Sequence, residues 1–203
     1  MMRCTLKSFC VSLVFLLAVS SPVWAQGIAA GSGEVTGNFG YAHVNGITSK
    51  NHVSFGSSVV YDLNQIVALG GEYNYQPLGS ETIYPGITGT AHLQTYGGVA
   101  RFSLTKSPSV VPYALAGFGG TDLSTAVSVQ NITFGVSQKG CYFASGGGAT
   151  IFACPRWGIR PELRYERQQF NSTTIGVDSV GSFGQNDVQA TVSVFYQFRG
   201  RRS

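Results

Sequence analysis

Three histidines and a serine are the first residues to test for chemistry. His52 and Ser54 lie two positions apart, so in an extended strand they share a face. Nucleophilic catalysis needs a serine bonded to a base that a third group orients, and no such signature is legible here. His43, His52 and His92 also lack an acidic neighbour at the spacing of a zinc site. The sequence therefore predicts no catalytic centre, no metal site and no cofactor.

Two cysteines remain to be considered in the second half of the chain. Cys141 and Cys154 lie at opposite ends of one predicted strand, which puts them roughly 40 Å apart at the rise of a strand. A disulfide needs Cα atoms within about 7 Å of each other. A continuous strand therefore predicts two unpaired thiols and excludes a chelating pair.

The most informative charges alternate along WGIRPELRYERQQ. Apolar Trp157, Ile159, Leu163 and Tyr165 fall on one face, and the charges fall on the other. Buried charges persist when they are paired and hydrogen-bonded, so alternating Arg and Glu are able to satisfy one another inside a closed structure. We predict an interior charge network of Glu72, Arg101, Arg160, Glu162, Arg164 and Glu166.

The elements that must position these charges are strands with a period of two. In DVQATVSVFYQF, residues 187–198, polar and apolar residues alternate, with Phe195 as an exception on the polar face. In a soluble sandwich the apolar face points into the core, whereas in an outer-membrane barrel it points into lipid. Only 11% of the chain is charged, against about 25% in a soluble domain, which favours a lipid-covered surface.

Eight such strands are predicted, and no helical period continues beyond the first residues. Short turns at 62–65, 105–109 and 155–156 alternate with longer polar links at 78–90, 122–140 and 171–186. Short and long links that alternate around an even number of strands are typical of an outer-membrane barrel. The predicted strands are 33–44, 52–61, 66–77, 91–104, 110–121, 141–154, 157–170 and 187–198.

The facing of most strands follows from the same alternation. In 91–104 we place Gly98, Ala100, Phe102 and Leu104 outward and Arg101 inward. The strand 141–154 is so rich in Gly and Ala that its facing stays open. Aromatic residues lie on the apolar faces, where they are able to form girdles at two membrane interfaces: Tyr41, Tyr61, Tyr73, Tyr75, Trp157, Tyr165, Tyr196 and Phe198.

The N-terminal residues have the pattern of an export signal. Arg3 and Lys7 precede an apolar run that is too short to span a bilayer, and Val23-Trp24-Ala25 is suited to a signal peptidase. We therefore predict a signal peptide at 1–25 and one barrel domain at 26–203. Removal of the signal peptide takes away Arg3 and Lys7 and lowers the formal net charge from +4 to about +2. A charge this small does not indicate a nucleic-acid partner.

The stretches GNFGYAHV, PYALAGFGG, PRWGIRPELRYER and VSVFYQF resemble the small eight-stranded outer-membrane barrels of the OmpA-like and opacity-type porin family. The resemblance covers essentially the whole of residues 26–203. It implies an all-β, eight-stranded antiparallel up-and-down transmembrane β-barrel in the bacterial outer membrane. It also implies outer-membrane lipid and lipopolysaccharide as surroundings, and the barrel-assembly machinery and periplasmic chaperones as partners during biogenesis.

The last strand looks like the signal that the assembly machinery reads in this family. Phe198 carries apolar residues at alternate positions before it. The residues that match are Ala190, Val192, Val194, Tyr196 and Phe198. Arg199 to Ser203 follow the terminal aromatic residue, whereas family members usually end on it.

Fold alone does not give function, and three hypotheses follow. The first is a structural or surface-interaction barrel whose links 78–90, 122–140 and 171–186 contact an unidentified extracellular ligand. The second is a narrow porin-like channel for small solutes, although eight strands leave little lumen. The third is an outer-membrane lipid-modifying enzyme, because some eight-stranded barrels resemble lipid A acylases or deacylases. The sequence favours the first, and no enzyme is predicted.

Overall fold

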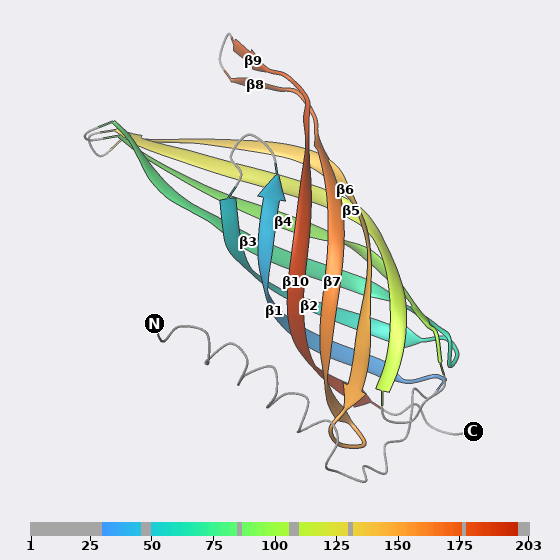
Figure 1. The fold of residues 1–203 in the computed structure, drawn as a ribbon. Helices are drawn as coiled ribbons and strands as arrows, with labels where there is room; N and C mark the ends of the chain where they lie inside the picture. Colours follow the sequence, from blue (N-terminus) through green and yellow to red (C-terminus); the bar gives the residue numbers. More distant parts are fainter. Residues whose placement is uncertain are drawn as a thin grey trace, which may run out of the picture.

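In a computed structural model the chain forms a closed antiparallel barrel (Figure 1). The structure describes residues 30–45, 50–84, 87–105, 110–129, 132–175 and 178–198. The predicted signal peptide at 1–25 and the tail at 199–203 lie outside the described residues. Among the described residues no helix is both long enough and apolar enough to cross a membrane.

Eight strands make the barrel, and each pairs antiparallel with its neighbours. The ring runs β1-β10-β7-β6-β5-β4-β3-β2 and closes where β1 pairs with β10. The prediction of an all-β, eight-stranded up-and-down barrel is therefore confirmed. The strands are β1 (Gly33–Asn45), β2 (Lys50–Asp62), β3 (Val67–Tyr84), β4 (Ile87–Ser103), β5 (Val110–Val129), β6 (Ile132–Phe152), β7 (Trp157–Phe170) and β10 (Phe183–Phe198).

The period of two sets which side chains face inward. Along β7 and β10, exposed and buried residues alternate almost without interruption. The polar face is the buried one: Arg160, Arg164 and Glu166 are buried, whereas Trp157 and Leu163 are exposed. The inside of this barrel is polar and its outside is apolar, as the sequence pattern predicted.

The two strands of ambiguous phase are also settled. In β4, Arg101 is buried, whereas Phe102 and Leu104 are exposed, in agreement with the predicted facing. In β6, Tyr142 and Ala144 are buried and Phe143 is exposed. Even-numbered residues of β6 therefore face the interior.

The predicted loops at 78–90 and 122–140 are wrong, because most of these residues are strand. β3 and β4 stay paired as far as Tyr84 and Ile87, and β5 and β6 as far as Val129 and Ile132. β4 also pairs with β5 as far as Ile87 and Val129. Ser, Thr and Gly predict loops in these segments, but pairing across three ladders satisfies most of their backbone N–H and C=O groups.

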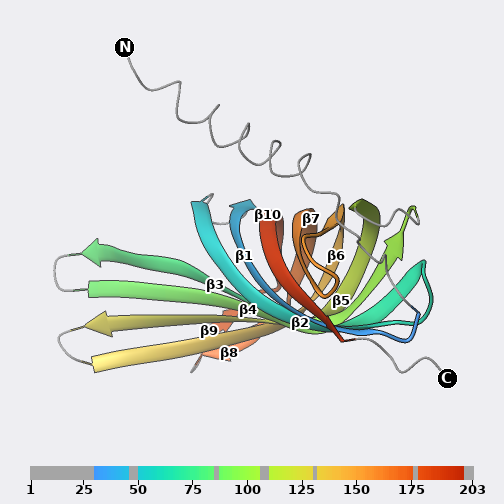
Figure 2. The same ribbon diagram turned by 90° about the horizontal axis from the view of Figure 1, so that it is seen from below.

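These long strands form a four-stranded sheet that continues beyond the barrel. We call it the extension and define it as residues 78–84, 87–94, 122–129 and 132–139. Figures 1 and 2 show its two hairpins running away from the barrel side by side.

The predicted loop 171–186 also needs correction, because it contains a small separate hairpin of β8 (Thr173–Ile175) and β9 (Asp178–Val180) and the first residues of β10.

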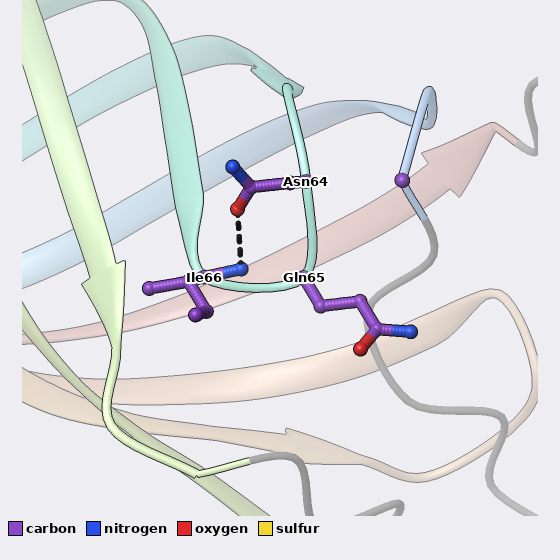
Figure 3. A pocket seen from close by; sticks show the side chains of 4 residues that line it. Asn64, Gln65 and Ile66 are labelled. Carbon is purple, nitrogen blue, oxygen red and sulfur yellow. Dashed lines mark hydrogen bonds between the residues drawn. The ribbon is translucent and has the colours of Figure 1, made fainter.

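Short turns join the strands at the opposite end of the barrel. Between β2 and β3, the Asn64 Oδ1 accepts hydrogen bonds from the backbone N–H groups of Ile66 and Val67, both at 2.8 Å. Figure 3 shows the bond from Ile66. Such side-chain bonds are how Asn stabilises turns. A shallow pocket lined by Ala30, Asn64, Gln65 and Ile66 lies beside this turn. Its lining carries no titratable group, so it offers no chemistry.

Candidate functional site

One layer of interior charge, in the half of the barrel near the short turns, is centred on Glu34 of β1. Arg160 of β7 donates to both of its carboxylate oxygens, at 2.9 and 2.6 Å. Arg101 of β4 donates to Oε1 at 2.7 Å. All three side chains are buried. Two guanidiniums from different walls therefore meet on one carboxylate, and together they cross the lumen.

A buried aromatic cluster lies beside this layer. Phe195, the exception in the alternation of β10, is fully buried. It packs edge-on against Phe152, with ring centroids 5.3 Å apart, and lies 4.7 Å from the Arg160 guanidinium. Phe195, Phe152 and Val111 form a buried apolar cluster. An inward aromatic residue thus packs against the charged layer, where a cation–π contact is favourable.

A second layer is centred on Arg164 of β7. Its Nη1 and Nη2 donate to the two oxygens of Glu72, at 2.8 and 2.9 Å. Since β7 and β3 stand opposite each other in the ring, this bidentate pair spans the full lumen. Arg164 also contacts Glu162 at 3.0 Å and Glu166 at 3.4 Å.

The structure therefore brings the predicted charges together in two groups rather than one. Arg101 and Arg160 meet on Glu34, whereas Glu72, Glu162 and Glu166 surround Arg164. Glu34 was missing from the predicted network. The alternation of residues 33–44 predicts that Glu34 lies on the polar face. It does not predict the partners of Glu34, because they lie on strands far away in the sequence.

Two tyrosines also complete the network and were not predicted. The Tyr113 hydroxyl donates to Glu162 at 2.6 Å, and the Tyr142 hydroxyl donates to Glu72 at 2.9 Å. Both rings are buried. Buried tyrosines usually find a partner for the hydroxyl. The inward parity of β5 and β6 would have revealed them, had the facing of 141–154 been assigned.

A third level lies nearer the extension and is rich in amides. Asp187 of β10 accepts hydrogen bonds from Gln76 and Gln189, both at 2.8 Å. Gln185 donates to Gln168 at 2.9 Å. Because Gln76 is on β3, this level is also bridged across the lumen. The described interior is thus crossed by polar side chains at three heights.

The histidines, Ser54 and the two cysteines lie apart from this network. Ser54 is fully buried, and its Oγ has no hydrogen-bond partner, so it is not bonded to a base. The Nδ1 of His43 lies 2.7 Å from Asn51 Oδ1, and His92 packs beside Tyr75. Among the described residues no three His, Cys, Asp or Glu side chains gather as a metal site. Cys141 and Cys154 are unpaired and exposed.

The outer surface of the barrel changes polarity along its strands. Towards the extension, the last apolar or small outward residue is followed, two positions on, by a polar one on seven of the eight barrel strands, and on β3 Tyr75 is instead followed by Pro77 and a register shift. On β4, Tyr96 is followed by Gln94, and on β7, Tyr165 is followed by Arg167. Between this level and the turns, each strand shows an apolar outer face of about nine to eleven residues, the length of a transmembrane strand.

Beyond that level the polarity of the two faces reverses. The outward face of the extension becomes polar, as in the cross-strand rows Gln94–Asp122–Lys139 and His92–Ser124–Ser137. The face continuous with the barrel interior becomes apolar, and it carries Leu93, Leu123, Val127, Phe134 and Val136. The extension therefore has the polarity of a sheet in water rather than in lipid.

Comparison with protein families gives one match, the outer membrane protein beta-barrel domain, over residues 11–198. The chain belongs to this family. No curated protein matches the sequence. The family places the barrel in the bacterial outer membrane, and the apolar band is therefore the part in contact with lipid. In such barrels the short turns face the periplasm and the long hairpins face the outside, so the extension is extracellular.

Solved outer-membrane barrels share the fold. The structure is similar to Neisserial surface protein A, with a TM-score of 0.63 and 14% identity over 83% of this chain and 99% of that one. It is also similar to Ail, the attachment invasion locus protein of Yersinia pestis, with a TM-score of 0.56, 14% identity and the same coverage. A major outer membrane protein of Thermus thermophilus has a TM-score of 0.55 and 7% identity over 82% and 99%.

Proposed function

We propose that this barrel is a surface-interaction protein and that the extension is its contact surface. Export by residues 1–25 and assembly through Ala190, Val192, Val194, Tyr196 and Phe198 belong to the same proposal. The observation that carries it is the reversal of polarity at the outer boundary of the lipid-facing band. Outside the membrane, an apolar face of a sheet is stable when a protein or another part of the chain covers it and removes it from water.

The open edge of the extension supports a protein partner. β6 from Ile132 to Gln138 pairs with β5, and within the described residues no strand pairs with its other edge. An unpaired edge displays N–H and C=O groups that another chain is able to extend. The opposite edge of the extension, in β3, belongs to a less regular strand, because the register of β3 against β4 shifts between Pro77 and Gly79 and again between Thr82 and Tyr84. β6 is therefore the edge that favours an extended partner segment.

One protein of similar structure points in the same direction without deciding the ligand. Ail is named as an attachment invasion locus protein, and a second structure shows it in complex with the heparin analogue sucrose octasulfate. The outward face of this extension is mostly Ser, Thr and Gln, with Lys139 as a basic residue. That face has little charge to attract a sulfated polymer, so we favour a protein partner for this chain.

The interior argues against the channel alternative. Arg164–Glu72 and Arg160–Glu34–Arg101 cross the lumen at two heights, and Phe195 is buried beside Arg160. An eight-stranded barrel is just wide enough to be filled by its own side chains. Enzymatic activity is not part of the proposal, since Ser54 has no base bonded to it.

A trimmed barrel tests the proposed function. Replacing residues 81–89 and 126–135 by two-residue Asn-Gly turns shortens both hairpins but leaves the lipid-facing strands intact. Bacteria displaying the wild type are expected to bind immobilised solubilised extracellular matrix, and the trimmed variant is expected to lose that binding. Heat-modifiable gel migration checks that the trimmed barrel still folds.

The matched control is a variant in which residues 173–180 are replaced by a two-residue turn. This change removes the separate β8–β9 hairpin and leaves the extension in place. Binding that survives trimming of the extension, or that is lost only with β8–β9, would contradict the proposed surface.

A further inference from the structure

The interior of the barrel carries more acidic than basic side chains. Among the side chains that the structure describes, three guanidiniums face inward, those of Arg101, Arg160 and Arg164. Half-buried His52 also faces inward, and even its protonation would leave the acids in excess. The inward carboxyl groups are those of Glu34, Asp62, Glu72, Glu162, Glu166 and Asp187.

The excess negative charge lies in the extracellular half. Near the periplasm, Arg101 and Arg160 balance Glu34 and Asp62. Further out, among the side chains that the structure describes, Arg164 is the one guanidinium beside four acids, which are Glu72, Glu162, Glu166 and Asp187. Burying charge without compensation is costly, so additional positive charge would stabilise this half of the lumen.

Glu166 and Asp187 are where the need is greatest. They are direct partners in the register of β7 and β10, and both are fully buried on the inward face. Like charges placed directly opposite each other destabilise a sheet. Glu166 accepts two long hydrogen bonds, from Arg164 Nη1 and Gln168 Nε2, each at 3.4 Å.

The hydrogen bonds of Asp187 leave one side of its carboxylate unused. Gln76 and Gln189 both donate to Oδ2, at 2.8 Å, whereas Oδ1 has no partner. The Oε1 of Gln76, on the amide that is bonded to Asp187, also has no partner. Both side chains are at least 99% buried. Two buried acceptor oxygens, on the hydrogen-bonded side chains of Gln76 and Asp187, therefore lack a donor or a cation.

We propose that the extracellular half of the lumen binds a hard, calcium-like cation between Glu166 and Asp187, with the Gln76 amide oxygen as a neutral ligand. Oxygen is the only donor type in this set, and Ca²⁺ accepts carboxylate, amide and water oxygens in flexible geometry. A site with two carboxylates agrees with the absence of a three-member acidic or histidine cluster among the described residues. The cation would supply the missing charge and stabilise the folded barrel.

Calcium binding by the refolded barrel tests the proposal directly. The wild type is refolded in detergent free of lipopolysaccharide, because lipopolysaccharide itself binds divalent cations. Equilibrium dialysis with radioactive calcium, at fixed ionic strength in KCl, is expected to show one bound equivalent. The melting temperature, followed by heat-modifiable gel migration, is expected to be higher in calcium than in chelator.

Two variants separate this site from general charge effects. Asp187→Asn should lose the bound equivalent and the calcium-dependent shift in melting temperature. Asp122→Asn removes the same charge from the outward face of the extension and should retain both. If Asp187→Asn does not refold, Gln76→Leu and the wild-type dialysis give the answer.

The proposal is overturned if the wild type binds no stoichiometric calcium and melts at the same temperature with and without chelator. Protons on the carboxyl groups would then balance the interior. It is also overturned if Asp122→Asn and Asp187→Asn lose calcium equally, because the ion would then be bound outside the lumen. The proposal does not depend on the extension having a partner, so the two ideas fail separately.

Discussion

Arg164 holds the largest share of the interior network, because three carboxylates depend on it. Removing one partner of a buried ion pair typically costs about 3–5 kcal/mol, since the other charges are left uncompensated. We expect Arg164→Ala to lower the free energy of unfolding by that order, measured by urea titration of the refolded barrel. The variant should also open the lumen and show a larger conductance in planar bilayers.

Arg167 is the matched control for Arg164. It lies on the same strand, three residues on, but faces outward and is exposed. Arg167→Ala should change the free energy of unfolding by no more than about 0.5 kcal/mol. Equal losses for the two variants, with no change in conductance for either, would show that Arg164 does not bridge the lumen.

Gly158 shows how close packing restricts a single position. A Cβ placed there would meet the backbone carbonyl of Ile151 and the ring of Phe195. Gly158→Ala should therefore destabilise the barrel by about 1–3 kcal/mol, the usual cost of overpacking. At Gly98, on the lipid-facing side, the nearest atom to an added Cβ is 3.8 Å away. Gly98→Ala should melt like the wild type, and a matching loss at both positions would argue against the placement of Phe195.

At the scale of elements, β4 contains both lipid-facing and water-facing residues on the same outward face. Ala100 lies within the apolar band, whereas Thr90 lies in the extension. An arginine facing lipid near the midplane costs about 2–4 kcal/mol, and near the interface it costs about 0–1. We therefore expect Ala100→Arg to destabilise the barrel in lipid vesicles and Thr90→Arg to leave its unfolding unchanged. Similar costs for both would move the boundary that we place between Tyr96 and Gln94.

The same element explains which sequence signals misled the strand boundaries. Segments 78–90 and 122–140 are rich in Ser, Thr and Gly, and such composition usually marks loops. Cross-strand pairing made them strands, because each of the two hairpins gives the other a ladder along β4 and β5. The pattern within one segment does not show whether another hairpin will pair with it, so the extension was not predictable from the sequence.

At the scale of the whole molecule, closure depends on β10, which pairs with both β1 and β7. Phe198 is 51% exposed at the end of this strand. Little packing is lost when it is truncated, so Phe198→Ala should leave the stability of the refolded barrel nearly unchanged. If the last strand is read by the assembly machinery, as we propose, the same variant should reduce the amount of assembled barrel in cells.

A lipid-facing aromatic residue elsewhere provides the comparison. Phe39 on β1 is 57% exposed and far from the chain end. Phe39→Ala should assemble in cells as the wild type does, measured by heat-modifiable migration of outer-membrane extracts. Equal assembly of the Phe39 and Phe198 variants would remove the terminal strand from the proposed role.

The sequence by itself determined the architecture, the number of barrel strands, and which face of most strands is polar. Those properties are local, because the period of two and the short turns act within a few residues. It also indicated that Arg160, Glu162, Arg164 and Glu166 share a face.

Only the tertiary structure decided which charges meet and how far the strands reach. Arg160 and Glu34 are 126 residues apart in sequence, and only the register of a closed ring brings them to 2.6 Å. The reversal of polarity in the extension and the opposed pair of Glu166 and Asp187 follow from the same registers. Strand pairing is set by contacts between distant segments, and no pattern within one segment specifies them.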